Sequence, residues 1–121
     1  MNIEELRIGN ILKIGVNYDY IHSIELALEY WETDSINYNE PEDYEPIPLT
    51  HEILESIFGG GGFGYYNLFG EESDTLKFNG KYISYLPYDS QYFIHLKHVD
   101  SVHALQNWYF YFYGKELQIE L

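Results

Sequence analysis

Residues 75–86, with the sequence TLKFNGKYISYL, say most about the fold. Thr75–Phe78 and Lys81–Leu86 are rich in β-branched and aromatic residues, which favour strands. The Asn79-Gly80 pair between them is typical of a tight two-residue reversal, because the central positions of such a turn need a positive φ. These residues predict an antiparallel hairpin.

Upstream of this hairpin, the sequence predicts a helix from about His51 to Phe58. Thr50 is a good N-cap, because its hydroxyl can accept a hydrogen bond from a free N–H of the first turn. Three apolar residues fall on one helical face: Ile53, Leu54 and Ile57. The four glycines at 59–62 then end the helix.

A second helix is predicted over about residues 101–113, with Asp100 or Ser101 as its cap and Gly114 at its end. Its apolar stripe consists of Val102, Leu105, Trp108, Tyr109 and Phe112. The rival interpretation is a strand through the aromatic run 109–113, since aromatic residues favour sheets. The agreement of cap, stripe and terminal glycine favours the helix.

Further strands complete the prediction of a sheet. A second hairpin is predicted at residues 11–16 and 20–24 around a turn at 17–19, and two more strands at 65–69 and 91–96. The fold class that follows is α+β: one domain over residues 1–121, with a small twisted antiparallel sheet and two covering helices, at about 51–58 and 101–113.

Composition limits the function. Six Lys and Arg residues against twenty Asp and Glu residues give a formal net charge of −14, and 45% hydrophobic content is too apolar for a disordered acidic tail. Such a surface repels phosphate backbones and anionic lipids, so we expect no direct binding to nucleic acid or membrane. The chain lacks cysteine, a signal-like N-terminus and any run of 18 apolar residues, which favours a cytoplasmic location.

Three segments occur in a fixed order along almost the whole chain: ELRIGN at residues 5–10, EPIPLT at 45–50, and HALQNWYF at 103–110 followed by GKEL at 114–117. In these segments the chain resembles small uncharacterised proteins of phages and prophages of gut bacteria. The family continues its last motif with a less aromatic stretch, whereas residues 111–113 are bulky here. The resemblance implies a phage-related origin, a place in the host cell cytoplasm and a shared fold, but no activity and no catalytic residue.

Candidate catalytic and metal patterns are weak. His51 resembles the start of a metalloprotease helix, but Glu55 occupies the place of the second histidine. The other histidine cluster, His95, His98 and His103, falls on different predicted elements. The glycine run at 59–64 leaves a helix C-terminus, where the helix dipole repels phosphate. We expect no enzyme, no metal and no cofactor.

Aromatic residues are the remaining anomaly. Fourteen Tyr, seven Phe and two Trp make 23 of 121 residues, more than a small core can enclose. Some rings must therefore reach the surface, where they can stack on a nucleobase or seal a protein interface. The residues expected to bind a ligand are Tyr82, Tyr85, Tyr88, Trp108, Tyr111, His103 and Lys81.

Two functional hypotheses follow. The first is a non-enzymatic phage-type protein that counters host defence by sequestering a nucleotide-like signal through aromatic stacking. Two copies would enclose the ligand as a homo-oligomer, because a chain this short offers little concavity of its own. In the alternative, the acidic arm at residues 25–55, with ten Asp and Glu and no Lys or Arg, mimics a nucleic acid and inhibits a host DNA-binding protein.

Overall fold

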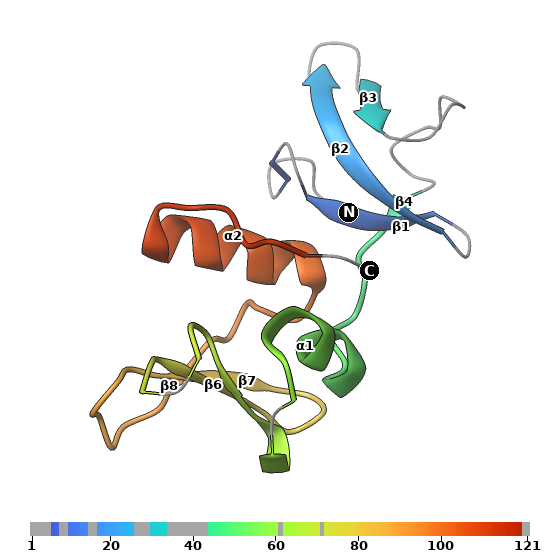
Figure 1. Cartoon of the computed structure of the whole chain (residues 1–121). Helices are drawn as coiled ribbons and strands as arrows, with labels where there is room; N and C mark the ends of the chain where they lie inside the picture. Colours follow the sequence, from blue (N-terminus) through green and yellow to red (C-terminus); the bar gives the residue numbers. More distant parts are fainter. Residues whose placement is uncertain are drawn as a thin grey trace. The chain divides into compact units, whose positions relative to one another are not determined.

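The computed structural model describes residues 6–7, 10–14, 17–25, 30–33, 44–60, 62–70 and 72–119 (Figure 1). Both helices and antiparallel strands are present, which confirms the α+β class. The contacts divide the chain into a first unit, residues 1–48 and 101–116, and a second unit, residues 49–100 and 117–121. Each unit has its own sheet of four strands, where the sequence predicts a single sheet. That residues 1–121 form one domain stays a prediction.

The sheet of the first unit has the strand order β3-β2-β1-β4. Its strands are antiparallel: β1 (Ile11–Ile14), β2 (Asn17–Glu25), β3 (Tyr30–Thr33) and β4 (Tyr44–Glu45). The predicted N-terminal hairpin is confirmed, but the turn expected at residues 17–19 is wrong. Those residues lie in β2, where they pair with β1 from Ile14 opposite Asn17 onward, so the backbone ladder outweighs the turn preference of Asn and Asp.

The helix of the first unit, α2 (Val102–Tyr113), confirms the helical interpretation of the aromatic run. The Ser101 hydroxyl accepts a hydrogen bond from the Ala104 N–H at 3.3 Å, as the predicted cap requires. At the other end, Gly114 adopts a left-handed φ of 73° and donates its N–H to the Phe110 carbonyl. Both termini of α2 are therefore satisfied by residues that the sequence identifies.

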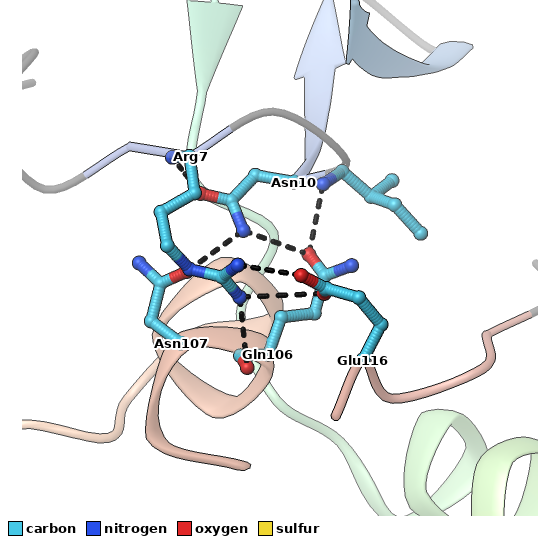
Figure 2. A network of polar contacts seen from close by, with 6 residues as sticks. Arg7, Asn10, Gln106, Asn107 and Glu116 are labelled. Atoms are coloured by element: carbon cyan, nitrogen blue, oxygen red, sulfur yellow. Dashed lines mark hydrogen bonds and ion pairs between the residues drawn. The ribbon is translucent and has the colours of Figure 1, made fainter. Parts of the chain in front are cut away.

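Arg7 ties the segment before β1 to α2 and to the chain that follows it (Figure 2). Its Nε donates to Asn107 Oδ1 at 2.8 Å, and its Nη2 donates to the Gln106 carbonyl at 3.2 Å. Its Nη1 forms an ion pair with Glu116 at 2.6 Å, and its Cζ lies 4.1 Å from the centre of the Phe110 ring. Each of the three nitrogens of this half-buried guanidinium therefore donates to at least one acceptor.

Asn10 and Gln106 are buried polar residues beside Arg7, and Asn10 Nδ2 donates to Gln106 Oε1 at 3.5 Å (Figure 2). Asn10 Nδ2 donates to Asn107 Oδ1 at 2.9 Å, and Gln106 Oε1 accepts the backbone N–H of Ile11 at 2.9 Å. The side chain of Gln106 thus supplies an acceptor at the first residue of β1, and α2 holds β1 by a directed polar contact.

Replacing Gln106 by Leu leaves the Ile11 N–H buried without its acceptor. A buried unsatisfied donor costs about 1–3 kcal/mol, so the free energy of unfolding, measured by urea titration, should fall by that amount. Gln118→Leu is the matched control, because the same change is made at an exposed side chain. Equal losses in the two variants would contradict the role given to Gln106.

The second unit begins with α1 (His51–Phe58), whose bounds match those predicted. Thr50 caps α1 by accepting the Ile53 N–H at 3.2 Å, and the helix ends at Gly59. A short 3-10 turn, η3 (Gly62–Gly64), follows. No helix in the described residues is long and apolar enough to cross a membrane.

The sheet of the second unit runs in chain order, and Figure 1 shows β6, β7 and β8 side by side. Its antiparallel strands are β5 (Tyr65–Asn67), β6 (Thr75–Phe78), β7 (Ile83–Leu86) and β8 (Ile94–His95). Tyr66, Leu76 and Tyr85 lie opposite one another and are buried. The His51 ring of α1 contacts Tyr66 and Phe78, so α1 lies against this buried inner face.

The hairpin of β6 and β7 is confirmed, but its reversal is longer than the two residues predicted. Phe78 pairs with Ile83, so residues 79–82 connect the strands. The Asn79 side chain explains the difference, because its Oδ1 accepts the N–H of Lys81 at 2.9 Å and of Tyr82 at 2.7 Å. Because these two N–H groups donate to the Asn79 side chain, they are not available for the backbone hydrogen bonds of a two-residue hairpin.

Gly64 lies in a close backbone approach between η3 and β6. Its φ is +80°, and an added Cβ would lie 2.4 Å from the Phe78 carbonyl oxygen. Gly64→Ala should therefore destabilise the protein by more than about 1 kcal/mol in urea unfolding. Gly60→Ala is the control, because a Cβ there meets nothing within 4 Å. A Gly64→Ala variant as stable as the control would contradict this packing.

Two tyrosines make stability sensitive to alkali. Burial, and secondly the charge of Glu55, raise the pKa of Tyr66, and burial raises the pKa of Tyr109. An unfolded phenol ionises near pH 10, so above that pH the unfolded chain holds fewer protons than the folded one and stability falls. We expect the free energy of unfolding to decrease as pH rises above about 10, and to decrease less in Tyr109→Phe. Identical alkaline profiles would contradict the assignment to Tyr109.

Candidate functional site

The outer face of the second sheet carries a row of side chains, one from each strand. Tyr65 lies opposite Lys77, Lys77 opposite Ser84, and Ser84 opposite His95. Residues directly opposite in an antiparallel sheet place their side chains on the same face, and successive residues alternate. Because Leu76 occupies the buried inner face, this row points away from α1.

Two further rings join the row through ring contacts. Phe93 lies just before β8 and Tyr82 just before β7, two residues before His95 and Ser84 respectively. The Tyr65 and Phe93 ring centres lie 6.3 Å apart, and those of Tyr82 and His95 lie 5.3 Å apart. The exposed fractions of Tyr65, Phe93 and Tyr82 are 40%, 41% and 50%, so these rings offer apolar area to solvent.

Both lysines of this surface lie against its rings. Lys77 Nζ is 5.5 Å from the centre of the Tyr65 ring and 5.4 Å from that of Phe93. Lys81 Nζ is 5.1 Å from the centre of the Tyr82 ring. These distances are those of cation–π contacts. We call this surface, made of Tyr65, Lys77, Lys81, Tyr82, Phe93 and His95, the aromatic–lysine face.

The charge of this face is opposite to that of the whole chain. Lys77 and Lys81 are two of only six basic residues in a protein of net charge −14. Neither forms an ion pair with a carboxylate of the described residues. Each ammonium therefore keeps hydrogen-bond donors available to an anion from solvent.

This arrangement suits a ligand that is both flat and anionic. Exposed aromatic faces stack on planar rings, and ammonium groups beside them can hold phosphate oxygens. His95 adds a second ring beside Tyr82. Within the part of the chain that the structure describes, no group of three or more His, Cys, Asp or Glu side chains is placed to hold a metal ion.

Four of the residues expected to bind a ligand lie in the second unit, and two of them belong to the aromatic–lysine face. These two are Lys81 and Tyr82. Tyr88 is exposed, and its backbone N–H donates to Asp74 Oδ1 at 2.7 Å. Tyr85 is buried and donates its hydroxyl to Asp74 Oδ2 at 2.7 Å. Its position on the inner face makes Tyr85 a core residue, with no ring face open to a ligand.

The other three expected residues lie on α2, in the first unit. Trp108 is half-buried, and its ring stacks on Phe112 with centres 5.4 Å apart. Tyr111 is exposed. His103 is buried, with Nδ1 3.2 Å from the Ser101 hydroxyl oxygen. The seven expected residues thus divide between the two units.

Tyr65, Lys77, Phe93 and His95 are not among the seven residues that the sequence selects for the ligand site. The signal that could have found Lys77 is the two-residue period of the strands. It places Lys77 on the exposed face, whereas its neighbours Leu76 and Phe78 are on the buried face. Strand register then places Lys77 beside residues distant in sequence.

No protein-family model matches the chain, and no curated protein and no solved structure matches it. The resemblance to small phage and prophage proteins stays an expectation from the three sequence motifs. Function has to be inferred from the chemistry of the aromatic–lysine face.

Proposed function

We propose that this protein binds a small nucleotide-like molecule on the aromatic–lysine face and sequesters it without converting it. The single observation that carries the proposal is the position of Lys77, whose ammonium lies almost equally far from the exposed rings of Tyr65 and Phe93, at 5.5 and 5.4 Å from their centres. A cation and two ring faces at one point match a ligand that has a phosphate next to a base.

The net charge of −14 does not prevent such binding. At physiological ionic strength the Debye length is about 8 Å, so exposed carboxylates farther away repel a phosphate only weakly. An ammonium in direct contact with that phosphate is much less screened, and a charge-assisted hydrogen bond is roughly twice as strong as a neutral one. Lys77 and Lys81 would therefore dominate the local potential.

The wider setting of the proposal comes from sequence. If the chain is a phage protein, the sequestered molecule would be a signal of host defence, withheld in the host cytoplasm by a protein that is not an enzyme. Two copies would close over the ligand, because the aromatic–lysine face is the outer surface of a sheet.

The alternative hypothesis, mimicry of nucleic acid by the acidic arm, stays a prediction. Residues 26–29 and 34–43 of that arm lie outside the described residues. The aromatic–lysine face, by contrast, carries two lysines beside exposed rings, and this favours an anionic ligand for that face.

Calorimetric titration of the intact protein with adenosine and guanosine monophosphates tests the proposal. At least one of them should bind, and the matching free nucleoside should bind more weakly because it lacks the phosphate. Lys77→Gln should weaken binding about tenfold or more, the loss expected for a charge-assisted hydrogen bond. The variant should unfold at the same urea concentration as the unaltered protein, since Lys77 is exposed.

Lys115→Gln is the charge-matched control, because Lys115 is exposed and lies in the first unit. It changes the net charge by the same amount and should leave the affinity unchanged. Absence of heat with every monophosphate, or equal losses in the two variants, would refute binding at the aromatic–lysine face.

A further inference from the structure

The aromatic–lysine face contains two separate groups of the same composition. The first group is Lys77 with the rings of Tyr65 and Phe93. The second group is Lys81 with the ring of Tyr82, which in turn contacts His95. Each group has its own cation and its own exposed ring, so each is complete as a contact for one base and one phosphate.

The separation of the two groups follows from the strand register. Ser84 lies between Lys77 on β6 and His95 on β8, so these two residues are two strand spacings apart, about 10 Å. Tyr82 lies in the connection just before β7, two residues before Ser84, and its ring contacts His95 rather than Lys77. A single base can cover one group, and a second base is needed to cover the other.

We infer that the ligand of this face has two nucleobases linked through phosphate, as in a dinucleotide, with one base on each group. This inference rests on the proposed function and narrows its ligand class. Lys77 and Lys81 would each pair with a phosphate, and the rings of Tyr65 or Phe93 and of Tyr82 would each stack on a base. The second base binds as an intramolecular event once the first is in place, which raises affinity without any new kind of contact.

The number of groups also limits the length of the ligand. The described face offers two lysine–ring groups, and a third nucleotide would add charge without a matching cation. In a protein of net charge −14, that addition brings repulsion rather than affinity. Affinity should therefore rise from one nucleotide to two and rise no further with three.

Calorimetric titration of the intact protein with adenosine monophosphate, 5′-phosphorylated diadenylate and 5′-phosphorylated triadenylate tests the inference. Diadenylate should bind at least about tenfold more tightly than the monophosphate, and triadenylate no more tightly than diadenylate. The guanosine series repeats the test if the guanosine monophosphate is the one that binds.

Variants of the second group give an independent readout. Tyr82→Leu and Lys81→Gln should each reduce the gain of diadenylate over the monophosphate, while the monophosphate still binds at the first group. Tyr92→Leu is the control for ring loss, because it removes an exposed tyrosine ring outside the face and should preserve the gain. Lys81→Gln changes an exposed loop residue, so it keeps the test valid if Tyr82→Leu fails to fold.

The outcomes separate the two proposals. Equal affinity for monophosphate and diadenylate overturns the two-base inference and leaves the proposed function standing. A further tenfold gain with triadenylate also overturns it, in favour of binding to longer single strands. Absence of binding by all three probes in both the adenosine and the guanosine series overturns both proposals.

Discussion

Side chains on a β-strand point alternately to opposite faces, and this constraint decides which residues of the second sheet form its core and which lie on its outer face. Leu76 and Tyr85 face inward and are buried, and their neighbours Lys77 and Ser84 consequently face outward. A slip of one residue would exchange the two faces and bury Lys77. The apolar inner face thus locks the register on which the aromatic–lysine face depends, so core packing and candidate site are consequences of one pattern.

The charge of the outer face of the second sheet differs from that of the whole chain. The acidic excess gives the whole chain a charge that opposes binding of anions. On the outer face of the second sheet, rings hold two ammonium groups in place by cation–π contacts, away from any described carboxylate partner. A small anion can be selected at such a face, while a long polyanion meets repulsion from the rest of the surface.

Much of the local structure could be predicted from sequence. Both helices carry their own start and stop signals, and Thr50 and Ser101 act as caps as expected. The division of strands into two sheets could not be predicted, because the pairing of β4 with β1 is set by contacts distant in sequence. The prediction of a two-residue turn at Asn79-Gly80 is wrong. The hydrogen bonds that the Asn79 side chain accepts, rather than the backbone preference of Asn-Gly, set the length of the connection.

The candidate site could be predicted in part. The expectation that the core cannot enclose every ring is confirmed, since nine Phe and Tyr rings of the described residues are exposed. Tyr82 and Lys81 of the aromatic–lysine face are among the residues expected to bind a ligand, whereas the expected residue Tyr85 is buried and Lys77 is not one of the seven. The wrong turn length does not explain these differences. The observed register of β6 and β7 differs from the expected one by two residues, and a shift of two leaves every side chain on the same face of the sheet. The alternation of side chains along the two strands places Lys77 and Tyr85 on opposite faces of the hairpin.

The central claim is that the ligand lies on the outer face of the second sheet. Its most direct test is a nuclear magnetic resonance titration of isotope-labelled protein with a nucleoside monophosphate, following backbone amide and aromatic signals residue by residue. The account predicts shifts concentrated at Tyr65, Lys77 and Tyr82, with the signals of α2 unchanged. Shifts confined to α2, or to buried residues such as Tyr85, would contradict it.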